Sequence, residues 1–170
     1  MSTEPGIWLA DLTYTQQGIS ADLMPAAIGG IALFAEKRLS LKNEIELFKY
    51  PETLANKLSG GRLPNVIGFS CYIWNASLSY AFAKRIKQLN SNVIVVFGGP
   101  NFPLDEYSQK KWLNKYSAVD FYIAKEGEIA FASLLEEYLG SEKHVEEIHG
   151  TIPSVYSLTP ENGFCFRPTA

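Results

Sequence analysis

The feature that most constrains this chain is the unbroken apolar run Val93–Phe97, with the sequence VIVVF. A run of this length, rich in β-branched residues, is typical of a strand that is buried on both faces. Such strands lie at the centre of parallel sheets that carry helices on both sides. Because parallel neighbours are joined by long crossover connections, we expect helices between the strands. The run therefore predicts an α/β protein with a mostly parallel sheet.

Strand-like and helical segments alternate around this central run. The predicted strands are Ile7–Leu12, Glu44–Phe48, Val66–Ser70, Val93–Phe97 and Val119–Ile123. The predicted helices are Pro25–Arg38, Pro51–Ser59, Ala76–Leu89, Leu104–Tyr116 and Glu128–Leu139. Alternation of this kind indicates βαβ units with right-handed crossovers. We therefore expect a flavodoxin-like, doubly wound, five-stranded parallel sheet with the strand order 2-1-3-4-5.

The C-terminal part of the chain has a different pattern. Ile152–Leu158 and Phe164–Arg167 alternate apolar and polar residues, and the turn-rich segment 160–163 separates them. This pattern predicts a β-hairpin. We therefore divide the chain into an α/β domain over residues 1–140, and a polar linker with a β-hairpin over residues 141–170.

Charge and hydropathy exclude several classes of function. The 170 residues include 15 basic and 18 acidic ones, which gives a net charge of −3. A chain without a positive field is not expected to bind nucleic acid. No apolar run reaches the roughly 18–20 residues that span a bilayer, and the polar start Met1–Gly6 is no secretory signal. Cys71 and Cys165 form no spaced cluster. We expect a cytoplasmic protein that contacts no membrane.

The residues that follow the predicted strands are the candidates for ligand binding. In an open parallel sheet, ligands bind at the carboxyl ends of the strands. Gly98 and Gly99 let the backbone turn sharply and let a large ligand approach, although an ordinary turn would also explain them. Tyr72 and Trp74 either fill a core or line a pocket for a flat ligand. The candidate set is Thr13, Thr15, Gln16, Ser70, Tyr72, Trp74, Asn75, Gly98, Gly99, Pro100, Asn101, Glu126, Gly127 and Glu128.

Two adjacent glycines, Gly29 and Gly30, lie inside the first predicted helix. Each costs the helix roughly 1 kcal/mol relative to alanine. Two explanations would account for glycines at this cost: close packing of the helix on the sheet, or close approach of a ligand. The sequence leaves both reasons open, with close packing favoured.

No catalytic or metal-ligating constellation is present in the sequence. There is no Gly-x-Ser-x-Gly elbow and no phosphate-binding P-loop motif. His144 and His149 lie in the polar linker without the spacing of a metal site. Cys71 has no histidine partner in the predicted topology and is expected to be an inert buried thiol. The pattern favours a ligand-binding module.

Taken in order, the segments ADLTYTQQG, MPAAIGGIALFAEKRL, IGFSCYIWN, VVFGGPN and AKEGE resemble the N-terminal B12-binding domain of cobalamin-dependent radical SAM enzymes. The hairpin segment IPSVYSLTPENGFCF is similar to the segment that joins this domain to a radical SAM barrel. The resemblance implies that cobalamin binds at the carboxyl edge of the sheet, with backbone contacts from Gly98, Gly99, Glu126 and Gly127. It also implies a methyltransferase-like parent enzyme with a radical SAM barrel, a 4Fe–4S cluster and S-adenosylmethionine.

The sequence departs from the resembled proteins at two points. The Cys-x3-Cys-x2-Cys triplet of the radical SAM barrel is absent, so the chain is expected to be one domain of a longer enzyme, without radical chemistry of its own. Cobalamin-dependent mutases carry Asp-x-His-x-x-Gly after the first strand, and its histidine is the lower cobalt ligand. Here Asp11 is followed by Leu12 and Thr13, and a hydroxyl is a poor cobalt ligand. The resemblance therefore implies a cobalamin without a histidine lower ligand.

Two other functions stay open at the level of sequence. Thr13–Gly18 is rich in hydroxyl groups, like the phosphate loop of an FMN-binding flavodoxin, but the next helix begins only near Pro25. The second alternative is a degenerate docking domain that binds no cofactor. A phosphorylatable receiver domain is disfavoured because Ser70 stands where that family has an aspartate.

Overall fold

The computed structural model describes residues 6–14, 25–41, 44–140, 148–159, 161 and 163–168. The strands are β1 (Ile7–Ala10), β2 (Ile45–Phe48), β3 (Val66–Ser70), β4 (Ile94–Gly98), β5 (Phe121–Ile123), β6 (Val155–Leu158) and β7 (Phe164–Phe166). The helices are α1 (Ala26–Leu39), α2 (Pro51–Ser59), α3 (Ala76–Leu89), α4 (Glu106–Lys115) and α5 (Gly127–Gly140). Across these residues, no helix is long and apolar enough to span a membrane.

The strands form a single sheet with the order β2-β1-β3-β4-β5-β6-β7. β1 to β5 run parallel in the predicted order, so the doubly wound topology is confirmed. The predicted C-terminal hairpin is also confirmed as β6 and β7. It adds two strands to the predicted five-stranded sheet, because β6 pairs antiparallel with β5. The hairpin thereby covers the edge of β5, which would otherwise expose unpaired backbone groups. The division of the chain at residue 140 stays a prediction.

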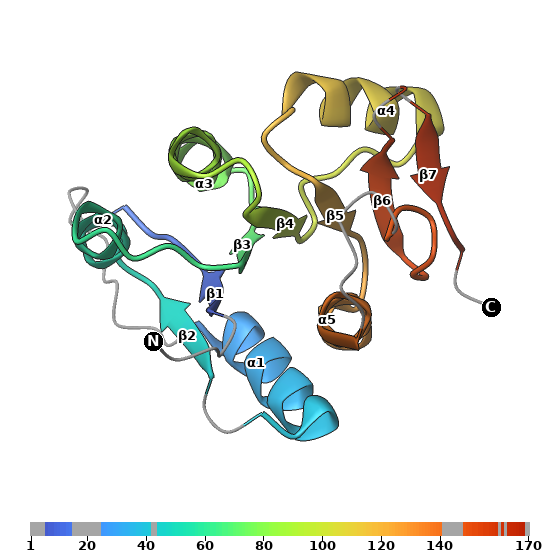
Figure 1. Ribbon diagram of the computed structural model, residues 1–170. Coiled ribbons are helices and arrows are strands. Elements are labelled where there is room, and N and C mark those ends of the chain that lie inside the picture. Colours follow the sequence, from blue (N-terminus) through green and yellow to red (C-terminus); the bar gives the residue numbers. More distant parts are fainter. Residues whose placement is uncertain are drawn as a thin grey trace.

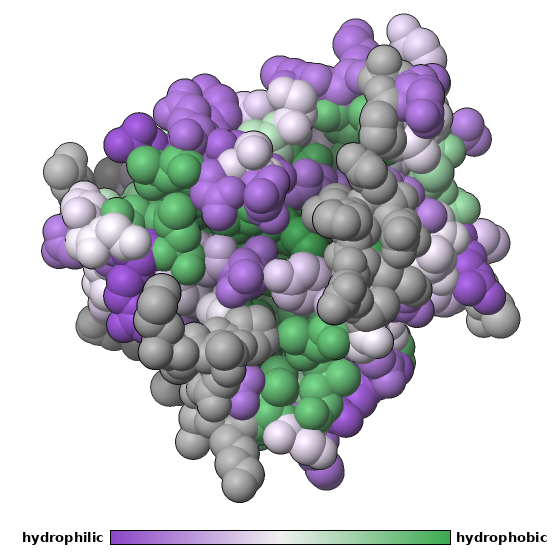
Figure 2. Space-filling model, in the orientation of Figure 1, coloured by the Kyte–Doolittle hydropathy of each residue, from purple (hydrophilic) through white to green (hydrophobic). Residues whose placement is uncertain are grey.

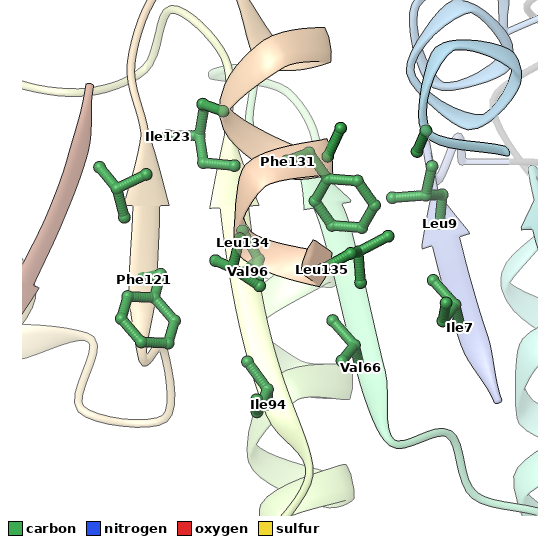
Figure 3. Packing of buried hydrophobic residues seen from close by; sticks show 14 of the residues in the cluster. Ile7, Leu9, Val66, Ile94, Val96, Phe121, Ile123, Phe131, Leu134 and Leu135 are labelled. Atoms are coloured by element: carbon green, nitrogen blue, oxygen red, sulfur yellow. The ribbon is translucent and has the colours of Figure 1, made fainter. Parts of the chain in front are cut away.

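Helices cover both faces of the sheet, with α1 and α5 on one side and α2, α3 and α4 on the other (Figure 1). Alternate residues along each strand face opposite layers, which produces two separate hydrophobic cores. The core under α5 is drawn in Figure 3, where strand residues such as Val66 and Val96 face Leu134 and Leu135 of this helix. In the lower part of Figure 2, where α1 and α5 lie, apolar residues also gather on the surface.

The central strand β4 has the environment that its sequence predicts. Ile94 to Phe97 are all buried, because the two helical layers cover both faces of this strand. The start of α4 differs from the prediction, since the helix begins at Glu106 and Leu104 is 99% exposed. The side chain of Asp105 accepts a hydrogen bond from the amide of Ser108 at 2.9 Å, and this cap sets the first turn.

Candidate functional site

A cleft of about 400 Å³ opens at the carboxyl edge of the parallel strands. Its walls come from α1 on one side and from the start of α5 on the other, and strand residues form its floor. Figure 3 shows Phe131 of α5 beside Leu9 of β1, near the ends of the strands. Both side chains line the cleft. The cleft therefore lies at the edge where parallel α/β sheets bind ligands.

The structure brings together most of the predicted site residues. Those that line the cleft are Ser70, Tyr72, Gly98, Gly99, Pro100, Glu126, Gly127 and Glu128. Those that do not line it are Thr13, Trp74, Asn75 and Asn101. Thr15 and Gln16 lie outside the described residues. The loops after β3, β4 and β5 thus meet at one site, as the rule for parallel sheets predicts.

Sequence reasoning missed the apolar walls of the cleft. The additional lining residues are Leu9, Ala27, Ile28, Ile31, Gly68, Phe69, Val96, Phe97, Ile123, Lys125 and Phe131. In the sequence, most of them have the pattern of ordinary core residues of strands or helices. Gly68 is the exception, because a glycine inside a buried strand signals close approach of another group. A Cβ at Gly68 would lie 2.6 Å from Cδ2 of Leu9 and 3.4 Å from Cε2 of Phe131.

The two glycines after β4 differ in what surrounds them. Gly99 has φ = +130°, and a Cβ there would lie 2.8 Å from the carbonyl oxygen of Cys71. A Cβ at Gly98 would make only ordinary contacts, the nearest at 3.5 Å from the carbonyl oxygen of Ile123. Gly99 is therefore required by the turn itself. The alternative that its missing side chain leaves space for a ligand is wrong, because that direction is filled by the backbone of Cys71.

The helical glycines also have separate causes. A Cβ at Gly127 would lie 2.9 Å from Cδ1 of Ile31, so this glycine lets the start of α5 approach α1. A Cβ at Gly29 would meet nothing within 4 Å, and one at Gly30 only Oε1 of Glu128 at 3.9 Å. The favoured explanation for Gly29 and Gly30, close packing on the sheet, is therefore wrong. Among the described residues, only Glu128, which lines the cleft, comes near either of these two glycines.

A buried polar network joins the ends of β1 and β3. Asn75 is fully buried, and its Nδ2 donates to Oγ of Ser70 at 3.1 Å and to Oδ1 of Asp11 at 3.4 Å. The hydroxyl of Ser70 also donates to Asp11. Oδ1 of Asn75 accepts from the amide of Tyr72 at 2.8 Å. Asn75 stands at the N-cap position of α3, but its side chain makes no capping hydrogen bond and belongs to this network.

The two aromatic candidates in the loop after β3 form a stacked pair. The rings of Tyr72 and Trp74 are nearly parallel, with centroids 4.5 Å apart. Tyr72 lines the cleft, while Trp74 is 62% exposed. The pair thus extends an aromatic surface outward from the mouth of the cleft.

The described cysteine and histidine side chains provide no metal centre at the cleft. Cys71 is fully buried, and burial raises the pKa of its thiol, as expected for an inert thiol. The ring of His149 packs against Phe121 at the first residue of β5, which is the opposite end of the sheet from the cleft. His144 lies outside the described residues. No group of three His, Cys, Asp or Glu side chains suited to a metal ion occurs in the described part.

Comparison with known proteins identifies related sequences. Residues 44–135, more than half of the chain, match the family model of the B12 binding domain. The cobalamin-dependent radical SAM methyltransferase TokK of Streptomyces tokunonensis is 34% identical over 87 residues. The 2-(S-pantetheinyl)-carbapenam-3-carboxylate methyltransferase of Streptantibioticus cattleyicolor is 32% identical over 87 residues. Each alignment covers 51% of this chain and only 12% of the relative.

A solved structure has the same architecture. The cobalamin-dependent S-adenosylmethionine radical enzyme OxsB, with aqua-cobalamin and S-adenosylmethionine bound, superposes with a TM-score of 0.71. The superposition covers 99% of this chain and 22% of that one, at 14% sequence identity, so it concerns the fold alone. The family assignment rests on the sequence match, which includes β2 to β5 and the loops that border the cleft. The chain therefore belongs to the B12-binding domain family.

Proposed function

We propose that this chain holds cobalamin with the corrin ring at the carboxyl edge of the sheet and the nucleotide tail in the cleft between α1 and α5. The observation that carries the proposal is the cleft itself. It is bordered by the segments Gly98–Pro100 and Glu126–Glu128. These segments lie at the ends of the adjacent parallel strands β4 and β5, and both fall within the region that matches the B12-binding family.

The walls of the cleft suit the flat aromatic base of the nucleotide tail. The apolar surface of the cleft comes from residues that include Ile28, Ile31, Val96 and Phe131. Gly68 has no side chain that would fill the space between the strands and α5. A volume of about 400 Å³ is within the range of small-molecule sites, roughly 300–1,000 Å³. It holds a nucleotide base but not a corrin macrocycle. The corrin therefore lies over the mouth.

The mouth carries the polar groups that corrin amides need. Glu126 and Glu128 present carboxylates, and Lys125 presents an ammonium group. Carboxylates accept hydrogen bonds from amide N–H groups, and the ammonium donates to amide carbonyls. When bound, cobalamin would supply its cobalt centre to the chemistry of the parent enzyme. The roles of this chain are to bind the cofactor, to orient it and to cover one face of it.

We further propose that the lower face of the cobalt receives no imidazole from this domain. Thr13 stands where mutases have histidine, and its amide donates to the carbonyl of Lys49 at 3.1 Å, beside the end of β2. His149 lies at the opposite end of the sheet. EPR of the Co(II) form should therefore lack the hyperfine splitting of an axial imidazole nitrogen. Such splitting from a protein histidine would contradict the proposal.

We also propose that the parent protein is a methyltransferase-like radical SAM enzyme. It would contain a radical SAM barrel with a 4Fe–4S cluster and would use S-adenosylmethionine. The support is that both relatives are methyltransferases, although this chain matches only a small part of each. The free thiols of Cys71 and Cys165 support a cytoplasmic location, where thiols stay reduced. The negative net charge supports partners other than nucleic acid.

Equilibrium dialysis of the 170-residue chain against hydroxocobalamin tests the proposed function. We expect retention at about 100 μM ligand, which corresponds to roughly 5.5 kcal/mol of binding free energy. A parallel dialysis against FMN tests the flavodoxin-like alternative. No retention of hydroxocobalamin would contradict the proposal, and retention of neither ligand would favour a docking domain.

A further inference from the structure

Tyr122 is a buried residue whose hydroxyl contacts the loop after β4, at Gly99. It stands in the middle of β5 with no exposed surface, and its hydroxyl donates to the carbonyl oxygen of Gly99 at 2.8 Å. Its neighbours Phe121 and Ile123 belong to the core under α5, whereas Tyr122 belongs to the core on the opposite face. Tyr122 does not line the cleft. It therefore contacts the loop from behind, across the sheet from the cleft.

The same loop is also bonded to Cys71, the residue that follows β3. Nδ2 of Asn101 donates to Sγ of Cys71 at 3.7 Å. The backbone of Cys71 completes the connection, because its amide donates to the carbonyl of Gly98 at 2.6 Å and its carbonyl accepts from the amide of Asn101 at 3.2 Å. The segment at the end of β4 is thus bonded at three backbone positions, Gly98, Gly99 and Asn101.

This network favours one conformation of the loop. Gly99 has a left-handed φ of +130° and lies directly against the backbone of Cys71. Pro100 has no amide hydrogen with which to stabilise the turn. If the carbonyl of Gly99 turned away, the buried hydroxyl of Tyr122 would lose its acceptor, which is costly inside a protein. The side of the loop that lines the cleft is therefore oriented by a group behind it.

Aromatic rings keep the Tyr122 side chain in place. Phe102, which follows the loop, stacks on the Tyr122 ring with centroids 4.0 Å apart and planes 13° from parallel. Trp112 contacts the same ring edge-on at 5.0 Å. Phe102 also lies 5.1 Å from the ring of Tyr156, which stands opposite Tyr122 on β6. The hydroxyl is consequently held at one position relative to the loop.

We infer that Tyr122 is a positioning residue for the cofactor: its hydroxyl, with Cys71, fixes the loop that presents Gly98, Gly99 and Pro100 to the corrin. This inference rests on the proposed function, and it adds a residue that neither touches the cofactor nor lines its cleft. Cofactor affinity then depends on a hydrogen bond on the far face of the sheet.

The test compares Tyr122→Phe with Tyr156→Phe in the 170-residue chain. Both variants remove one hydroxyl from the same aromatic cluster, but Tyr156 stands on β6, and the hydroxyl that donates to the loop carbonyl of Gly99 is that of Tyr122. We expect similar melting temperatures for the two variants. The dissociation constant for hydroxocobalamin should rise about five- to tenfold in Tyr122→Phe and less than twofold in Tyr156→Phe, the range of one hydrogen bond.

Amide hydrogen exchange supplies a readout that does not need the cofactor. In the ligand-free chain, the amides of Cys71 and Asn101 should exchange faster in Tyr122→Phe than in Tyr156→Phe. Equal exchange and equal affinity in the two variants would overturn the inference while leaving the proposed function intact. No binding by the wild-type chain would overturn both. If Tyr122→Phe does not fold, Phe102→Leu replaces it, because the ring of Phe102 stacks on Tyr122 and keeps its hydroxyl in place. Wild-type affinity in that variant overturns the inference.

Discussion

The loop after β4 and the first half of α1 both border the cleft, and both contain paired glycines, but the surroundings of these glycines are opposite. At Gly99 the nearest backbone atom would lie 2.8 Å from an added Cβ, and the φ angle is one that side chains disfavour. At Gly29 an added Cβ would meet nothing within 4 Å. The loop requires glycine, whereas the helix only tolerates it. A Gly-Gly pair in a sequence therefore does not reveal its physical cause.

The largest effect that this comparison predicts is that of Gly99→Val. The valine would combine an unfavourable φ with a clash against the carbonyl of Cys71. We expect a loss of about 3 kcal/mol in unfolding free energy, which lowers the melting temperature by about 6–12 °C. Loss of cobalamin binding follows from the loss of structure. Gly98→Ala is the control for stability, because its Cβ makes ordinary contacts.

The measurement is thermal unfolding of both variants followed by dialysis against hydroxocobalamin. A Gly99→Val chain that melts near the wild-type temperature but retains no cofactor would break the comparison. That result would mean that the position serves the ligand and not the turn.

An intermediate effect is expected for Gly68→Ala, inside β3. The new Cβ would lie 2.6 Å from Cδ2 of Leu9, so the Leu9 side chain must shift. Overpacking of this kind typically costs about 1–3 kcal/mol. Because Leu9 lines the cleft, the affinity for hydroxocobalamin should fall as well. Chemical denaturation and dialysis measure the two effects, and unchanged affinity would show that the floor of the cleft does not contact the cofactor.

The smallest effect, with the opposite sign, is expected for Gly29→Ala. Alanine is favoured over glycine in a helix by roughly 0.5–1 kcal/mol, and nothing near Gly29 opposes the added methyl group. The melting temperature should therefore rise by about 1–4 °C, with unchanged retention of hydroxocobalamin. A fall in affinity without a fall in stability would show instead that a ligand approaches the exposed side of α1.

Much of the fold follows from the local pattern of apolar and polar residues. The pairing of strands at the edge of the sheet does not. The run VIVVF predicts a central strand because a strand buried on both faces needs apolar residues throughout. The alternation around it yields the order of β1 to β5 through general rules of connection. The hairpin pattern was also readable, but its pairing with β5 depends on an edge that exists only after the sheet forms.

The candidate site shows the same division at the level of single residues. The positions of Gly98 and Glu126 follow from the rule that loops after parallel strands meet at one edge. The walls formed by Ile31 and Phe131 could not be predicted, because they depend on how α1 and α5 pack against each other. Asn75 stands at the N-cap position of α3, yet its side chain donates to Asp11, 64 residues earlier in the chain.

The sequence by itself determined the secondary-structure periodicity, the parallel order of β1 to β5 and the edge at which the cleft opens. Each of these depends on residue patterns within a few positions of one another or on general rules of chain connection. Only the tertiary structure decided why Gly99 is glycine and what holds it, since Cys71 and Tyr122 come from other strands. The physical reason is that hydrogen bonds and close contacts between distant segments exist only once the sheet has brought those segments together.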